Sequence, residues 1–393
     1  MSKDPVVILA ARRTPVGGFQ GVFSTVTAPQ LGAVAIKAAL ADSRVAPADV
    51  DEVMMGCVLP AGIGQAPARQ AAIGAGLPAS VPCTTVNKMC GSGMRTLMMA
   101  ADQIGAGNAD IIIAGGLESM TNAPYLLLKA RAGYRMGHGE VLDHMFYDGL
   151  QSPWDGKLMG CFADATAQEY GFTREAQDAF AAESVRRALT ACNGGGFAKE
   201  IAPVTAKGRK GEVVVDKDET PFTLDVAKIP TLKPAFGKNG TVTAASSSSI
   251  SDGASALVLA RESVAAKQGL KPLARILGYA SFAREPEWFT LAPVGAIQKV
   301  LKQVGWQAGD VDLYEVNEAF AAVTMAAIKD LSLDPARVNV NGGACALGHP
   351  VGATGARITT TLIHALAARG KKRGVAALCI GGGEATALAL ELV

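Results

Sequence analysis

The sequence predicts an α/β protein built from two similar halves, with a loop-rich segment inserted in the first. Short β-branched runs alternate with stretches in which apolar residues recur at helical spacing, as in strands covered by helices. The same order of elements occurs near both ends of the chain, and the periodicity weakens between them, over residues 120–246. Because alternating strands and helices favour parallel pairing, we expect two mixed, mostly parallel sheets covered by helices.

The first copy opens with a predicted strand over residues 6–9, which are Val, Val, Ile and Leu. A polar break at Arg12-Arg13-Thr14-Pro15 is expected to end this strand. Alanines at helical spacing then predict a helix over 31–40, and the run 50–56 predicts a second strand.

A strand-to-helix corner comes next in the first copy. Residues 81–87 are rich in β-formers and lead into Cys90-Gly91-Ser92-Gly93. A helix is expected to follow, because apolar residues then recur on one helical face. These residues are Met94, Leu97, Met98, Ala101 and Ile104. A short buried strand over 111–116 is expected to end in two glycines.

The second copy repeats this order in the last third of the chain. Asp310-Val311-Asp312 leads to a strand, as Asp49-Val50-Asp51 does in the first copy. Val340-Asn341 and then Cys345 open a Gly-rich turn and a helix, as Val86-Asn87 and then Cys90 do. The strand over 375–380 runs into three glycines, as residues 111–113 run into two.

These matches occur in the same order and at nearly constant separation, which indicates an internal duplication. The alternative is the general likeness among α/β units. We expect an N-terminal half at 1–119 and 247–271, the insert at 120–246 and a C-terminal half at 272–393. Such an insert often supplies substrate contacts while the rigid flanking elements hold the chemistry.

Composition limits the classes of function. The 393 residues are 49% apolar and 18% charged, which is enough for a large core and excludes a disordered chain. The net charge of +2 does not favour a nucleic-acid partner. The chain start shows no export signal, and the uncharged run over 70–87 is too polar for a membrane span. The seven cysteines include no CxxC pair, so we expect reduced thiols in a cytoplasmic protein.

Cys90 is the first candidate for chemistry. It follows a strand and opens a helix through Gly-Ser-Gly, which places its sulfur near free backbone N–H groups at the positive end of the helix dipole. Both features are expected to lower the pKa of a thiol and make it nucleophilic. The alternative is a small buried residue at a strand–helix corner.

His349 lies in the turn Gly348-His349-Pro350-Val351-Gly352, which suits a base that projects into a cleft. The glycines nearby lack the Gly-Lys-Ser/Thr ending of a nucleotide-binding loop. No second histidine lies four residues away, and His138 and His144 have no cysteine at ligand spacing. We therefore expect no metal site.

Cys379 and Asn317 each come at the end of a predicted strand. Cys379 precedes Gly381-Gly382-Gly383, whose backbone N–H groups could face an oxyanion. The alternative for Cys379 is a buried strand cysteine. Asn317 follows the strand 313–316 and precedes apparent helical residues, so its alternative role is that of a helix N-cap.

Taken together, five motifs resemble the thiolase family in the family's order and spacing, across essentially the whole chain. The motifs are Asn87-Lys88-Met89-Cys90-Gly91-Ser92-Gly93, Gly240-Thr241-Val242-Thr243-Ala244, Asn317-Glu318-Ala319-Phe320, Gly348-His349-Pro350 and Cys379-Ile380-Gly381-Gly382-Gly383. The family fold has two similar α/β halves with a loop domain inserted in the first, which agrees with the duplication and the insertion inferred above.

The resemblance implies a role for each catalytic candidate. Cys90 is expected to take the acyl group, and His349 to accept its proton. His349 and a water held by Asn317 would bind one thioester oxygen, and the backbone N–H groups of Cys90 and Gly381 would form a second oxyanion hole. Cys379 would protonate the leaving coenzyme A and remove the α-proton of the second acyl-CoA. Coenzyme A is then a substrate and product, and no cofactor is implied.

The finer resemblance is to the short-chain, biosynthetic-type members, which condense two acetyl-CoA molecules, partly through Gly64-Gln65-Ala66-Pro67-Ala68-Arg69-Gln70. It implies that a further set of residues lies at the acyl and coenzyme A sites: Leu150, Met159, Ser248, Ala319, Phe320 and Phe289. Where relatives have a Met-Gly pair this chain has Phe289-Thr290, and Leu158 replaces a common histidine. Both changes predict a more apolar acyl end, limited by Phe289.

Other functions remain as alternatives. A degradative 3-ketoacyl-CoA thiolase would accept longer chains, and a ketoacyl synthase would pair its cysteine with two histidines. A non-catalytic acyl-CoA or lipid-binding relative could lose Cys90, His349 or Cys379, and this chain retains all three. The resemblance also implies a homodimer or a tetramer made of two dimers.

Overall fold

The computed structural model describes residues 4–208 and 211–393. Residues 1–3, in the expected N-terminal half, and 209–210, in the expected insert, lie outside the described residues. The strands are β1 (Val6–Arg13), β2 (Gly17–Gly18), β3 (Glu52–Gly56), β4 (Cys83–Val86), β5 (Ile111–Ser119), β6 (Tyr125–Leu126), β7 (Leu142–Asp143), β8 (Val204–Gly208), β9 (Gly211–Val215), β10 (Ser251–Arg261), β11 (Ala274–Ala283), β12 (Leu313–Val316), β13 (Arg373–Ile380) and β14 (Glu384–Leu392).

Helices separate most of these strands. The α-helices are α1 (Ala28–Ser43), α2 (Pro67–Gly74), α3 (Ser92–Ala106), α4 (Met159–Tyr170), α5 (Arg174–Asn193), α6 (Glu262–Lys267), α7 (Ala292–Val304), α8 (Ala321–Asp330), α9 (Ala344–Leu347) and α10 (Thr354–Ala368). Shorter 3₁₀ and π turns are η1 (Pro47–Asp49), η2 (Phe146–Leu150), η3 (Thr220–Phe222), η4 (Val226–Thr231), η5 (Pro286–Leu291), η6 (Ala308–Asp310) and η7 (Pro335–Arg337).

Within the described residues, ten strands form one continuous sheet in the order β12-β13-β14-β11-β1-β10-β5-β3-β4, with β2 paired to β10. The α/β class is confirmed, but the expected parallel majority is wrong. Only the pairs β3–β4, β3–β5 and β12–β13 are parallel, and the others in this sheet are antiparallel. The parallel pairs are those joined by a crossover helix, whereas β14 returns from β13 through a glycine turn. The two expected sheets are also joined, because β1 pairs with β11.

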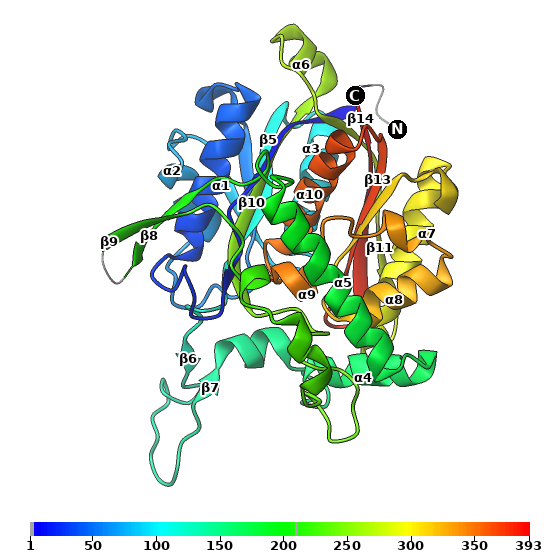
Figure 1. Ribbon diagram of the computed structural model, residues 1–393. Coiled ribbons are helices and arrows are strands. Elements are labelled where there is room, and N and C mark those ends of the chain that lie inside the picture. The colour runs from blue at the N-terminus through cyan, green and yellow to red at the C-terminus, as the bar shows by residue number, and fades with distance from the viewer. Residues whose placement is uncertain (1–3, 209–210) are drawn as a thin grey trace.

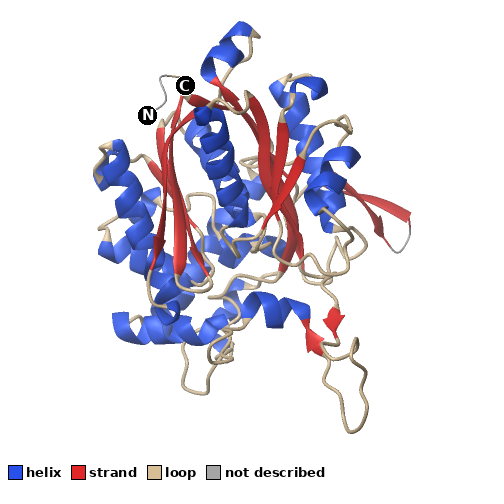
Figure 2. Cartoon of the chain, turned by 180° about the vertical axis from the view of Figure 1, so that it is seen from behind, coloured by secondary structure: helices blue, strands red, loops and turns tan. Residues whose placement is uncertain are grey.

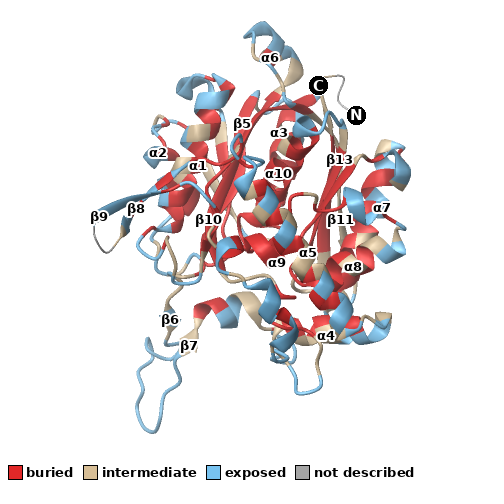
Figure 3. Ribbon diagram, in the orientation of Figure 1, coloured by how far each residue is buried: buried red, intermediate tan, exposed pale blue. Residues whose placement is uncertain are grey.

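Helices α3 and α10 lie between the two halves of the sheet, with α1 and α2 outside one half and α7 and α8 outside the other (Figures 1 and 2). The central core joins the inner faces of both halves to α3 and α10, through residues such as Met94, Leu97, Leu362 and Leu378. Helix α10 is buried along nearly its whole length (Figure 3), because it packs against strands of both halves of the sheet.

The duplication inferred from the sequence appears in equivalent contacts of the two halves. Asp51, just before β3, accepts hydrogen bonds from the N–H groups of Asp110 and Ile111 at 2.7 and 2.9 Å. Asp312, just before β12, accepts in the same way from Lys372 and Arg373 at 3.0 and 2.9 Å. In each half, one carboxylate just before a strand thus binds the N–H groups at the start of the neighbouring parallel strand, β5 in the first half and β13 in the second.

Two strands continue beyond their predicted ends. Strand β5 does not end at Gly115 and Gly116 but runs to Ser119. A Cβ at Gly116 would lie 2.1 Å from the carbonyl oxygen of Gly352, so this glycine permits a close approach rather than a turn. Strand β1 continues through the expected polar break to Arg13, whose buried guanidinium is neutralised by Glu200 and Asp218.

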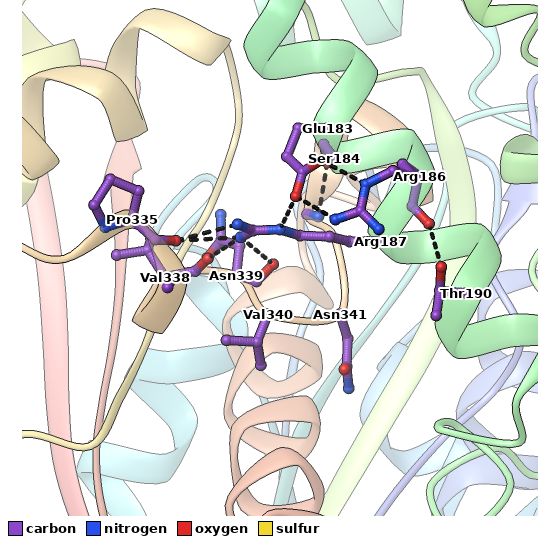
Figure 4. A network of polar contacts seen from close by, with 12 residues as sticks. Glu183, Ser184, Arg186, Arg187, Thr190, Pro335, Val338, Asn339, Val340 and Asn341 are labelled. Atoms are coloured by element: carbon purple, nitrogen blue, oxygen red, sulfur yellow. Dashed lines mark hydrogen bonds and ion pairs between the residues drawn. The ribbon is translucent and has the colours of Figure 1, made fainter.

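The segment over 120–246 contains more regular structure than expected, because it includes α4 and the 20-residue α5. Arg187 of α5 donates to the carbonyl oxygens of Pro335, Val338 and Asn339, which joins this segment to the loop before α9 (Figure 4). The hairpin β6–β7 projects from the body of the molecule (Figure 1). The expected boundaries at 119/120, 246/247 and 271/272 remain a prediction.

Candidate active site

A mainly apolar cavity of about 190 Å³ lies where the insert meets the two halves. Its lining residues are Met120, Phe146, Leu150, Leu158, Met159, Gly160, Phe236, Ser247, Ser248, Ser249, Ile250, Phe320, His349 and Val351. Two apolar clusters form its walls. One contains Met120 and Val351 and packs against Cys90, and the other contains Phe320 and Cys379. The cavity therefore adjoins both of the clusters that hold the cysteines singled out in the sequence.

Cys90 lies at the corner between β4 and α3, as the sequence predicts. Met89 before it has φ of +47°, a left-handed conformation that turns the chain sharply into the helix. The side chain of Asn87 holds this turn, because its Oδ1 accepts from the N–H of Met89 at 2.9 Å. At this corner Cys90 packs against the cluster that contains Val58, Leu59 and Val351, and Val351 lines the cavity.

The backbone N–H groups of Gly381 and Cys90 both form hydrogen bonds to the Cys90 sulfur and lower its pKa. Burial has the larger, opposite effect, and together with the negative charge of Glu118 it raises the pKa of Cys90 to about 11. The expectation of a lowered pKa is therefore wrong, because the sequence shows the helix terminus but not the depth of burial. Cys90 is a neutral thiol at pH 7 and needs a base to ionise it.

His349 lies at the cavity wall in the turn that precedes α10. Burial, aided by the positive charge of Arg357, lowers the pKa of His349 to about 3. The imidazole is consequently neutral at pH 7 and able to accept a proton. Among the described residues its Nε2 has no hydrogen-bond partner, whereas Nδ1 lies 2.6 Å from the hydroxyl oxygen of Thr354.

Asn317 follows β12 and is almost fully buried, as are its neighbours. It is not an N-cap, because α8 begins at Ala321 after Phe320 and has no side-chain cap. Neither the Oδ1 nor the Nδ2 of Asn317 has a partner within the described part of the chain. A buried amide with both polar atoms unbonded is costly for folding, which favours a role toward a ligand or water.

Replacing Asn317 by Ala should lower turnover by about 10²–10³-fold, the usual effect of removing one oxyanion donor. Stability should change little, since the amide makes no hydrogen bond within the described fold. Asn339→Ala is the matched control, because the Asn339 amide bonds both backbone atoms of Val316 at 2.8 Å. That variant should melt earlier. Thermal unfolding and steady-state rates measure both effects, and near-normal turnover in Asn317→Ala would remove Asn317 from the site.

Cys379 is fully buried near the end of β13 and belongs to the same cluster as Phe289 and Phe320. Burial, and then the proximity of Cys90, raise the pKa of the Cys379 thiol well above its ordinary value. The second effect also shows that the two sulfurs are close enough to interact. The turn that follows needs glycine, because Gly382 and Gly383 have φ of +99° and +93°.

The residues expected to contact substrate fall into two groups. Leu150, Met159, Ser248 and Phe320 line the cavity. Ala319 and Phe289 are instead buried in the cluster around Cys379. The N–H of Ser248 donates to the carbonyl oxygen of Ala319 at 3.0 Å, which holds the Ser246–Ser249 loop against the loop after Asn317. Leu158 also lines the cavity, so one of the two apolar replacements faces it directly.

Sequence reasoning missed Glu118, which is fully buried in β5. Its carboxylate accepts from the N–H groups of Val58 and Gly352 at 2.8 and 2.9 Å and from that of Leu59 at 3.2 Å. Burial raises the pKa of Glu118 to about 7. An acid within an otherwise apolar strand was the available signal. Phe146 and Phe236 also line the cavity and were not predicted to do so. Neither lies in a stretch of sequence with clear helical or strand periodicity.

Among residues 4–208 and 211–393, no group of three or more His, Cys, Asp or Glu side chains is arranged to hold a metal ion. None of the helices in those residues has the length and apolar character needed to cross a membrane. All seven cysteines are free thiols in the described structure.

Comparison with known proteins agrees with the fold and the motifs. A family model for the thiolase N-terminal domain matches residues 6–263, and one for the thiolase C-terminal domain matches residues 270–392. The chain is 50% identical over 387 residues to an acetyl-CoA acetyltransferase of Escherichia coli, with 98% of each chain covered. It is 48% identical over 395 residues to an acetyl-CoA acetyltransferase of Schizosaccharomyces pombe, with 100% of each covered.

A solved structure gives the same result in three dimensions. The crystal structure of the Bacillus anthracis acetyl-CoA acetyltransferase is 43% identical, covers 100% of both chains and superimposes with a TM-score of 0.97. The two domain models follow one another along the chain, and the relatives match over nearly its whole length. Both halves of the fold are therefore accounted for. The chain belongs to the thiolase family.

Proposed function

We propose that this chain is an acetyl-CoA C-acetyltransferase, which condenses two acetyl-CoA molecules to acetoacetyl-CoA and coenzyme A, and runs in reverse as a thiolase. The observation that carries the proposal is one apolar cavity whose walls belong to the two clusters that hold the Cys90 and Cys379 thiols, with a neutral imidazole in its wall. Several relatives matched over their whole length carry the name acetyl-CoA acetyltransferase.

In the first step His349 takes the proton of the Cys90 thiol, and the sulfur attacks the carbonyl carbon of acetyl-CoA. The carbon–sulfur bond to coenzyme A breaks, and Cys379 gives its proton to the leaving thiolate. Acetyl-Cys90 remains. The N–H groups of Gly381 and Cys90, which already reach the Cys90 sulfur, are placed to bind the oxyanion that forms next to it.

In the second step Cys379, now deprotonated, removes a proton from the methyl carbon of a second acetyl-CoA. The resulting enolate attacks acetyl-Cys90, and the Cys90–carbon bond breaks to release acetoacetyl-CoA. The Cys90 thiolate then takes back the proton that His349 accepted in the first step. His349 and a water held by Asn317 would stabilise the enolate oxygen. Coenzyme A enters only as substrate and product, so in this proposal the protein's own thiols and imidazole supply all of the acid–base chemistry.

The direct test measures release of free thiol from acetyl-CoA, and loss of acetoacetyl-CoA when coenzyme A is added. A series of C4, C6, C8 and α-methyl 3-ketoacyl-CoA substrates then defines the acyl range. The proposal expects the highest kcat/KM with the C4 substrate. A clear preference for C8 would instead indicate a degradative thiolase, and absence of turnover with all of them would contradict an enzymatic role.

Phe289 should set part of that acyl limit. Its buried ring packs edge-on against Phe162, with ring centroids 6.2 Å apart, in the cluster that contains Cys379. Phe289→Leu should raise the C8/C4 ratio of kcat/KM, because each additional buried methylene contributes about 0.8 kcal/mol. Phe23→Leu is the matched control, since Phe23 is equally buried in a different core. An unchanged ratio in folded Phe289→Leu would assign Phe289 to packing alone.

We propose that the protein assembles as a homodimer or as a tetramer made of two dimers, in the cytoplasm. Support for assembly comes from the projecting segment between β6 and β7, where Leu128 is 59% and Met136 95% exposed. Large apolar side chains exposed together usually mark an interaction surface. Support for the compartment is the set of free cysteines. Light scattering on the purified protein distinguishes the dimer from the tetramer.

A further inference from the structure

Thr354, the first residue of α10, is fully buried beside His349. Its hydroxyl oxygen makes two short contacts. It lies 2.6 Å from Nδ1 of His349, and it donates to the carbonyl oxygen of Pro350 at 2.9 Å. Both contacts are within the turn that carries the proposed base, and neither was anticipated from the sequence.

A hydroxyl group has one proton to donate. When that proton is directed to Pro350, the oxygen of Thr354 can only accept from His349, so Nδ1 must carry the ring proton. In the opposite arrangement Thr354 would donate to Nδ1. Two acceptor oxygens would then face each other at 2.9 Å, and the proton on Nε2 would be buried without a partner among the described residues. The first arrangement pairs the hydroxyl proton with Pro350 and the Nδ1 proton with Thr354, and it leaves only the Nε2 lone pair unbonded.

We propose that Thr354 is a positioning residue that selects the Nδ1–H tautomer of His349, and so leaves the Nε2 lone pair free to accept the proton of Cys90. This inference rests on the proposed function for the identity of the reaction. In the step concerned the S–H bond of Cys90 breaks and an Nε2–H bond forms. The electron pair stays on sulfur and makes the new bond to the carbonyl carbon, while Nδ1–H remains bonded to Thr354.

The backbone of the turn around His349 is held on both sides. The N–H of Gly352 donates to the buried carboxylate of Glu118, which is itself held by Val58 and Leu59. On the other side, Gly348 has φ of +101°, and a Cβ there would lie 2.2 Å from the hydroxyl oxygen of Ser251. With both ends of the turn held, the Thr354 hydroxyl decides which ring nitrogen is protonated.

Thr354→Val and Thr354→Ser form a matched pair of variants. Valine keeps the shape of threonine and removes the hydroxyl, whereas serine keeps the hydroxyl and removes a methyl group. We expect Thr354→Val to lower kcat by about 10- to 100-fold with little change in KM. This is less than the ~10⁴-fold loss known where a carboxylate sets the tautomer, because a hydroxyl is a weaker acceptor. The kcat of Thr354→Ser should remain close to that of wild type. The rate of acetylation of Cys90 should likewise be reduced in Thr354→Val and nearly unchanged in Thr354→Ser.

A spectroscopic measurement tests the tautomer of His349 without any enzymatic turnover. Its outcome therefore does not depend on whether the proposed function is correct. The chain has only four histidines, so ¹⁵N-histidine spectra of the solid protein can be assigned with a His349→Asn variant. Wild type and Thr354→Ser should show a protonated Nδ1 and a bare Nε2 at pH 7, and Thr354→Val should show a growing share of the other tautomer. A protonated Nε2 in wild type, or normal kcat in folded Thr354→Val, would overturn the proposal.

Discussion

Cys90→Ala should abolish both the condensation and the thiolysis reactions, because the acyl group then has no sulfur to which it can transfer. Loss of the nucleophile in an enzyme that works through a covalent intermediate costs on the order of 10⁶-fold in kcat. No other thiol can substitute. Cys379 is the nearest candidate, but it is fully buried, and burial holds its pKa well above the ordinary value.

The measurement is free-thiol release in both directions, together with intact-protein mass after exposure to acetyl-CoA. Wild type should gain one acetyl group and Cys90→Ala none. Cys192→Ala is the control, since Cys192 is a free cysteine near the end of α5, away from the cavity. It should react like wild type. Residual turnover in Cys90→Ala above about 1% of wild type, well beyond the expected ~10⁻⁶, would show that Cys90 is not the nucleophile.

Cys379→Ser should separate the two halves of the reaction. Acetylation of Cys90 should persist at a reduced rate, because coenzyme A is a good leaving group. Condensation should fall by about 10²–10⁴-fold, the usual contribution of one positioned acid–base group. A serine hydroxyl is a much weaker acid than a thiol, and burial makes its ionisation still less favourable.

In the proposed first step Cys379 gives its proton to the leaving coenzyme A, so it is a thiolate when the second acetyl-CoA binds. Full burial raises the pKa of this thiol well above its ordinary value, which makes the thiolate a strong base for proton abstraction.

Exchange of the methyl protons of acetyl-CoA with deuterated water reports this abstraction directly. Wild type should exchange, and Cys379→Ser should retain acetyl-Cys90 formation but lose most of the exchange. Cys379→Ala is the control for packing, because its thermal unfolding shows how far loss of the buried sulfur alone lowers the stability of the fold. Condensation at a near wild-type rate in Cys379→Ser would show that another group removes the proton.

Several elements of the fold could be predicted because their signals are local. The corner at Cys90 and the turn before α10 depend on glycines and a proline close in sequence, and both form where expected. The repeat was visible because the two halves use equivalent residues, such as Asp51 and Asp312, at equivalent strand starts. Strand direction was not predictable in the same way. The antiparallel strand β11 pairs with β1 and β14, which are both distant from it in sequence.

The sequence by itself determined the family, the two-half plan and the set of side chains proposed to react, because these depend on residue types at set spacings. Tertiary structure alone decided their protonation. Burial keeps Cys90 a thiol and His349 a neutral imidazole, and it opposes the helix terminus that the sequence reveals. The partners Glu118 and Thr354 also emerge only in three dimensions. The cost of desolvating a charge depends on everything packed around it, and most of those atoms come from elsewhere in the chain.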